Sequence, residues 1–89
     1  MEFLEALGEI VRRERKRRLL TQEGLAELAE LHSNYISLME RGRTAPALDT
    51  LVAISTALGR RPSQLLRAAE RLMNWTVPKT GSRPPRRRD

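Results

Sequence analysis

The sequence predicts an all-α fold, a compact bundle of five helices followed by a basic tail. Apolar residues recur at spacings of three and four along five segments, which is the period of an amphipathic helix. Glycine, proline or a capping threonine marks the ends of these segments, and none of them alternates as a strand does. The 89 residues suit one domain. Because the chain has no cysteine, burial of apolar side chains must hold it together.

The first two helices are predicted over residues 3–17 and 22–29. The apolar stripe of the first consists of Leu4, Leu7 and Val11, with Phe3 and Ile10 beside them. Thr21 precedes the second helix and can accept a hydrogen bond from a backbone N–H of its first turn. The residues expected to be buried in the second helix are Leu25, Ala26, Leu28 and Ala29.

Three further helices are predicted over residues 33–41, 48–58 and 62–74. Ile36 and Met39 form the inner face of the first of these, which ends at a glycine able to adopt the left-handed conformation. The pattern of the fourth helix consists of Leu48, Leu51, Val52, Ile54, Ser55 and Leu58, and it ends at Gly59. The fifth helix opens with Pro62 at a first helical position, and its pattern consists of Leu65, Leu66, Ala69, Leu72 and Met73.

The composition changes after Trp75, so we divide the chain into a folded domain, residues 1–75, and a tail, residues 76–89. The tail contains three prolines and little that could be buried, which predicts a disordered segment. It also carries five cations and one acid, a net +4 of the formal +6 of the whole chain. A basic protein of this size suggests a polyanion as partner, although a protein without such a partner can carry the same charge.

Several classes of protein are disfavoured by the composition. No apolar run approaches the ~18 residues of a membrane span, and the N-terminus is acidic where a signal peptide would be basic. The chain has no cysteine and one histidine, His32, so we expect no metal site and no cofactor. For the same reason we expect no enzyme.

The second and third predicted helices are short and are joined by only a few residues, and the third is polar at its start. Two helices in this arrangement form a helix-turn-helix, whose second helix lies in the major groove of DNA and touches base edges with its first residues. The pattern alone is moderately specific, because any small helical bundle has short helices and polar surfaces. It nevertheless explains why so short a helix starts with polar residues.

The residues at these positions carry a closer resemblance. They are Leu20, Thr21 and Gln22; Leu25 and Ala26; Tyr35, Ile36 and Ser37; Glu40, Arg41 and Gly42; Pro46; Leu48 and Leu51; and Leu58 and Gly59. Over roughly residues 7–66 the chain resembles the phage repressor and Cro-type helix-turn-helix family, also called the xenobiotic-response-element type. This resemblance implies a lambda-repressor-like bundle that binds double-stranded DNA, in a cytoplasmic, nucleoid-associated protein. The chain departs from the family at Glu30, where glycine is frequent, and at Gly24 inside the second helix.

The resemblance also implies a set of DNA-binding residues. Carried over position by position, they are Gln22, Ser33, Asn34, Tyr35, Ser37, Leu38, Arg41, Arg43 and Thr44. Asn34 can pair with an adenine edge, whereas Leu38 could contact only an apolar group such as a thymine methyl. Gln22, Arg41 and Arg43 would meet phosphates. The alternative is that short polar residues simply favour the first turn of a helix and that the basic loop is only solvated.

Arg15 continues an apolar stripe, so it needs a carboxylate partner if it is buried. Glu40 is the acid near the end of the third helix, and in the family this position pairs with that arginine. We therefore predict a structural ion pair between Arg15 and Glu40, which would hold the first helix against the DNA-reading unit. A free surface arginine is the alternative.

The end of the fifth helix carries apolar residues that could pair with a second copy of the chain. The predicted dimerisation residues are Leu66, Ala69, Met73 and Trp75. A homodimer would place two recognition helices about one DNA turn, ~34 Å, apart and would predict a palindromic operator. In the alternative, Trp75 folds back onto its own core. The leading function is a sequence-specific transcriptional regulator, such as a small repressor or controller protein, and the alternative is an interaction module or antitoxin-type subunit controlled by a partner protein.

Overall fold

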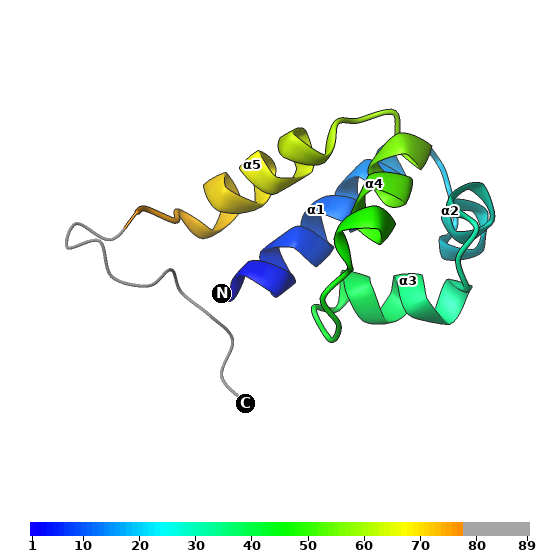
Figure 1. Ribbon diagram of the computed structural model, residues 1–89, viewed down its shortest axis with the longest axis horizontal. Coiled ribbons are helices and arrows are strands. Elements are labelled where there is room, and N and C mark those ends of the chain that lie inside the picture. Colours follow the sequence, from blue (N-terminus) through cyan, green and yellow to red (C-terminus); the bar gives the residue numbers. More distant parts are fainter. Residues whose placement is uncertain (78–89) are drawn as a thin grey trace.

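Five α-helices make up the folded part of the computed structural model, which describes residues 1–77 (Figure 1). They are α1 (Phe3–Arg17), α2 (Gln22–Ala29), α3 (Ser33–Glu40), α4 (Leu48–Ala57) and α5 (Pro62–Met73). No strand occurs in residues 1–77. The predicted all-α bundle of five helices is therefore confirmed, whereas the predicted disorder of the tail concerns residues that, apart from Thr76 and Val77, lie outside the described range.

Each of the five helices ends in the same way. A residue with positive φ lies at or directly after the C-cap of every helix. In α2 and α5 it is the C-cap itself, Glu30 and Asn74. In α1, α3 and α4 it is the next residue, Leu19, Gly42 and Gly59. In α2, for example, the Leu31 N–H donates back to the Ala26 carbonyl at 2.8 Å. Such a turn satisfies the last carbonyls of a helix. It also ends α3, α4 and α5 one residue earlier than predicted, at Glu40, Ala57 and Met73.

Helix α1 lies at the centre of the arrangement and contacts both α3 and α5. Helix α5 runs antiparallel to α1, and α2 packs on α3 and α4 (Figure 1). The fully or almost fully buried apolar side chains are Ala6, Leu7, Ile10, Val11, Leu25, Ala26, Ala29, Ile36, Met39, Leu51, Ile54, Leu58, Leu65 and Ala69. All five helices thus contribute to one core. Within residues 1–77, no helix is both long enough and apolar enough to cross a membrane.

A glycine in the middle of α1 allows a close contact with α3. A Cβ atom at Gly8 would lie 2.6 Å from the carbonyl oxygen of Glu40 and closer still to that of Met39. A second close approach occurs at Gly42, where a Cβ would lie 2.9 Å from the Cα of Glu5. Helix α1 therefore packs directly against the backbone at the C-terminal end of α3, and both contacts require the absence of a side chain.

The prediction that Leu28 is buried is wrong, because its side chain is 58% exposed. The face of α2 that meets the core is occupied by Leu25, Ala26 and Ala29, and Leu28 lies beside this face. Two residues of the predicted α4 pattern, Leu48 and Val52, are also exposed. Helix α2 packs mainly on α3 and α4 at the edge of the bundle, so it buries a narrower stripe than its sequence pattern suggests.

Candidate nucleic-acid interface

The connection between α2 and α3 is short and well defined by its hydrogen bonds. At the start of α2, the Gly24 N–H donates to the Thr21 hydroxyl at 2.9 Å, which confirms the predicted cap. At its end, Glu30 adopts the left-handed conformation with φ 58°. His32 then occupies the N-cap position of α3 with extended backbone, although its side chain makes no cap hydrogen bond. The polar residues Ser33 and Asn34 consequently form the first turn of α3.

The two sides of α3 differ in burial. Ile36 and Met39 face the core and are almost completely buried. Asn34, Ser37 and Leu38 are separated by three and four residues and therefore share one face of the helix. Asn34 is exposed, whereas Ser33, Ser37 and Leu38 are half-buried. The face predicted to read DNA is thus accessible at the N-terminal end of α3.

The residues that follow α3 form the loop that is predicted to contact the phosphate backbone of DNA. Arg41 and Arg43 are exposed and Thr44 is half-buried. The Nε of Arg41 donates to the Ser37 carbonyl at 3.3 Å, and the Arg43 N–H donates to the Leu38 carbonyl at 2.9 Å. These bonds hold the start of the loop against the end of α3, and both arginine side chains remain open to solvent.

Tyr35, one of the residues predicted to bind DNA, is half-buried on α3. Burial raises the pKa of its phenol, and the negative charge of Asp49 on α4 raises this pKa further. The hydroxyl therefore stays protonated, and it can donate a hydrogen bond, at neutral pH.

Arg15 and Glu40 lie together and are both buried. Arg15 Nε donates to Glu40 Oε2 at 2.7 Å, and Arg15 Nη2 donates to Glu40 Oε1 at 3.0 Å. Arg15 Nη1 donates to the Leu20 carbonyl at 2.8 Å. The hydrogen bond to Glu40 raises the pKa of Arg15, although burial acts in the opposite direction. This bidentate pair connects α1, the α1–α2 turn and the end of α3.

Gln22 belongs to the same network, which the sequence did not indicate. Its Nε2 donates to Glu40 Oε1 at 3.0 Å, so the first residue of α2 is tied to the last residue of α3. One N–H of the Gln22 side-chain amide is bound to Glu40, so the predicted contact with a phosphate would have to use the other N–H of the same amide. The structure thus gives Gln22 a positioning role, and its contact with a phosphate stays a prediction.

One of the predicted dimerisation residues is unavailable to a partner, because Ala69 is fully buried in its own core. It lies on the face of α5 that packs on α1, where a small side chain lets the two helices approach closely. Leu66, Met73 and Trp75 are half-buried, and Leu66 and Met73 pack against this core.

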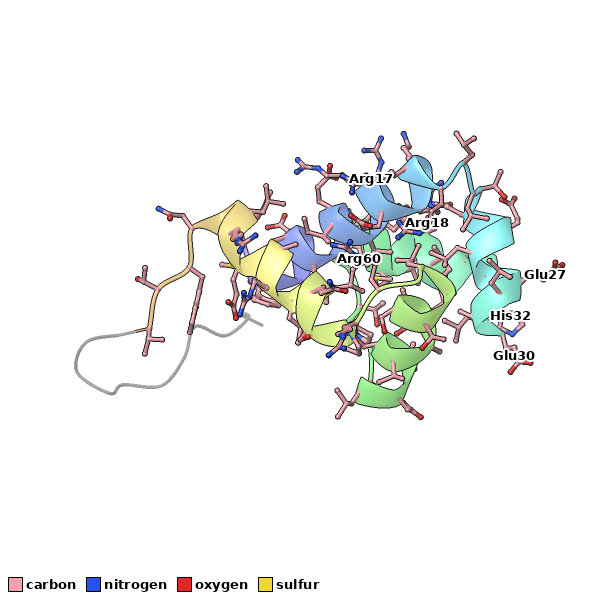
Figure 2. The ribbon with its side chains drawn as sticks, turned by 90° about the horizontal axis from the view of Figure 1, so that it is seen from above. Arg17, Arg18, Glu27, Glu30, His32 and Arg60 are labelled. Atoms are coloured by element: carbon pink, nitrogen blue, oxygen red, sulfur yellow. The ribbon has the colours of Figure 1, made fainter. Side chains whose placement is uncertain are left out.

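Charge is distributed unevenly around the candidate interface. Residues 19–40, which include α2 and α3, contain no lysine or arginine. They contain three exposed acids, Glu23, Glu27 and Glu30, and no ion pair within residues 1–77 involves them. Figure 2 shows Glu27, Glu30 and His32 together at the end of the molecule formed by α2 and the turn. Cations that face phosphates must therefore come from other segments, such as the loop after α3.

Two short helices, a left-handed turn between them and an exposed polar start of the second define a helix-turn-helix protein. The helix-turn-helix family model matches residues 11–65. The chain therefore belongs to this family, in its phage-repressor and xenobiotic-response-element branch.

Individual relatives agree with this assignment. The chain is 42% identical over 60 residues to the immunity repressor protein of Bacillus phage phi105, a match that covers 67% of this chain and 42% of the repressor. It is 39% identical over 66 residues to the control protein C.SmaI of Serratia marcescens, covering 74% of this chain and 79% of that protein. The chain thus spans less than half of the phage repressor.

Among solved structures, the clp gene regulator ClgR of Corynebacterium glutamicum superimposes with a TM-score of 0.80 at 31% identity. The match covers 83% of this chain and 79% of that one. The matched part of the chain therefore has the fold of a known gene regulator.

Proposed function

We propose that the protein is a sequence-specific regulator of transcription that binds double-stranded DNA and reads the major groove with α3. The observation that carries this proposal is the exposed Asn34 in the first turn of α3, on one face with Ser37 and Leu38. An asparagine at this point can form two hydrogen bonds to an adenine edge. The Arg15–Glu40 pair fixes the end of α3 and so keeps this face in a constant orientation.

The named relatives support a small repressor or controller protein, since one is an immunity repressor and another a control protein. Such a protein would act in the cytoplasm, at the nucleoid. The half-buried Leu66, Met73 and Trp75 at the end of α5 are the surface that we propose for a homodimer. A two-fold dimer would present two α3 helices to a palindromic operator.

The test separates base reading from phosphate binding. Asn34→Ala should cost roughly 1 to 3 kcal/mol on the preferred site and should relax the preference at one base position per half-site. Its affinity for a scrambled duplex should hardly change. Arg43→Ala should weaken binding to both duplexes. It should also lower the slope of log affinity against log salt by about one unit for each phosphate that the protein no longer neutralises.

The preferred site would first be selected from random duplexes, and both variants would then be titrated on selected and scrambled DNA at several salt concentrations. Thr56→Ala on α4 and Arg12→Ala on α1 are matched controls, because both residues are exposed and lie outside α3 and its loop. Selection of no motif would refute sequence-specific binding. An Asn34→Ala variant that loses affinity for both duplexes equally would refute the proposed docking of α3.

A further inference from the structure

A second charged cluster lies around Glu14, on α1 next to Arg15. The carboxylate is buried, and three arginines surround it. Arg18 Nη1 lies 2.8 Å from its Oε1, Arg17 Nη1 lies 3.3 Å from its Oε2, and Arg60 Nε lies 3.6 Å from its Oε1. One negative charge therefore faces three positive charges.

Arg60 is the least satisfied member of this cluster. Its Nε atom is buried and has no hydrogen-bond partner within residues 1–77, because the nearest oxygen of the Glu14 carboxylate lies 3.6 Å away. The same residue lines an open groove of about 440 Å³ along α5. The groove is lined by Arg60, Ser63, Gln64, Arg67, Ala68 and Arg71, which include three arginines and no acid. We call this surface the arginine groove.

The arginine groove lies far from the helix proposed to read DNA. In Figure 1, α5 is at the upper left and α3 at the lower edge, and α1 and α4 lie between them. Figure 2 shows Arg17, Arg18 and Arg60 gathered near the middle of the molecule, where α1 ends and α5 begins, whereas Glu27 and Glu30 lie at the end formed by α2 and the turn. No ion pair within residues 1–77 involves Arg67 or Arg71. The positive charge here is therefore available to an anion that does not touch α3.

We propose that the arginine groove binds the phosphate backbone of a second DNA duplex, so that one molecule can hold two segments of DNA. This goes beyond the proposed function, which concerns one duplex and α3. Every cation that lines the groove is an arginine, and the planar guanidinium group matches the oxygens of a phosphate in a bidentate manner.

The dimensions of the groove favour a duplex over a small anion. The residues of α5 that line the groove run from Ser63 to Arg71, eight positions apart, which corresponds to about 12 Å along a helix, and Arg60 lies just before this helix. One strand of duplex DNA presents a phosphate about every 3.4 Å along its axis, so it offers several phosphates over that length. Ser63 and Gln64 add neutral hydrogen-bond donors between the arginines. A single small anion would neutralise only one end of the groove.

The experiment uses the full chain and two duplexes of the same scrambled sequence. One duplex is fixed to beads and saturated with protein, and retention of a fluorescent second duplex is then measured. Wild-type protein should retain the second duplex. Arg67→Gln/Arg71→Gln should retain about tenfold less at moderate salt, because two cations that would neutralise phosphates have been removed. The matched control, Arg12→Gln/Arg13→Gln, removes the same charge from exposed positions on α1 and should retain the second duplex nearly as wild type does.

Several outcomes would overturn the proposal. The groove variant could retain the second duplex as well as wild type, which would mean that α3 or the tail holds both duplexes. The control could retain as little as the groove variant, which would mean that only total charge matters. Tripolyphosphate or polyglutamate could displace the second duplex at equal charge concentration as effectively as free duplex, which would assign the groove to small phosphates or to acidic polypeptides.

Failure of this inference is distinguishable from failure of the proposed function. If the groove variant selects the same base motif as wild type from random DNA, α3 still reads sequence whatever the groove does. If wild type selects no motif but the arginine substitutions still abolish retention of the second duplex, the proposed function fails and the arginine groove stands. Equal thermal melting of both variants and wild type shows that neither substitution acts by unfolding the chain.

Discussion

Two neighbouring residues of α1, Glu14 and Arg15, belong to two charged networks that differ in burial and in charge balance. Arg15 points to α3, where its bidentate pair with Glu40 leaves only 9% and 2% of the two side chains exposed. Glu14 meets Arg17 and Arg18 at the end of α1 and Arg60 just before α5, whose side chains are 69%, 31% and 35% exposed. The first network is balanced in charge and closed to solvent, whereas the second has an excess of positive charge and is open.

This difference indicates different roles for the two networks. A buried, fully hydrogen-bonded pair is costly to break but offers nothing to a ligand, because every strong donor already has an acceptor. An open cluster with surplus cations contributes little to stability, yet it keeps donors available for an anion. Helix α1 therefore fixes the recognition unit on one side and presents charge on the other.

The largest expected effect comes from breaking the closed network. Arg15→Ala should lower the free energy of unfolding by about 3 to 5 kcal/mol, because Glu40 would remain buried without a compensating charge. Glu40→Ala should have a similar effect. The double variant should lose less stability than the sum of the two, which a double-mutant cycle by urea denaturation would measure. Strictly additive losses would show that the two side chains do not stabilise each other.

The next effect concerns the backbone contact beside that network. Gly8→Ala should lower the free energy of unfolding by about 1 to 3 kcal/mol, because the new methyl group would overlap the carbonyls of Met39 and Glu40. Alanine is the better helix former, so the loss of stability would occur despite a favourable local propensity.

Gly24→Ala is the control for this substitution, since its Cβ would meet only the Thr21 hydroxyl, at 3.3 Å, and a leucine methyl. It should cost less than Gly8→Ala in the same thermal melt. The reverse order would mean that α1 can move away from α3 without a large penalty.

The smallest expected effect lies in the open network. Glu14→Gln should lower the free energy of unfolding by only about 1 kcal/mol, because its partners are partly exposed and screened by solvent. Added salt should reduce the difference between variant and wild type. In the two-duplex assay the same variant should retain more second duplex, since a negative charge beside Arg60 has been removed. A loss of stability as large as that of Arg15→Ala would erase the distinction between the two networks.

Much of the fold was predictable because its signals are local. Thr21, Gly42, Gly59 and Pro62 mark helix ends through interactions that span a few residues. The ion pair of Arg15 and Glu40 was predicted from the family resemblance together with the need of a buried cation for a carboxylate. The DNA-contacting residues of α3 remain a prediction, because base contacts depend on the position of a duplex.

Other features were not predictable, because they depend on how many neighbours cover a helix. The apolar pattern of α2 includes Leu28, but α2 packs mainly on α3 and α4 and this leucine stays exposed. The pattern of α5 made Ala69 a candidate for a dimer surface, yet α1 covers it completely. A hydrophobic period identifies the apolar side of a helix but not the width of the surface that faces it.

The sequence by itself determined the helical class, the approximate ends of the helices and the polar start of α3, since hydrophobic period, caps and turn residues act within one or two helical turns. Only the tertiary structure decided that Gly8 lies on the carbonyls of α3, that Gln22 joins the Arg15–Glu40 pair and that Arg60 reaches Glu14. These contacts join residues 18 to 46 positions apart in the chain. They depend on the angles at which whole helices pack. These angles are determined by the burial of apolar side chains from all five helices, and no local sequence pattern specifies them.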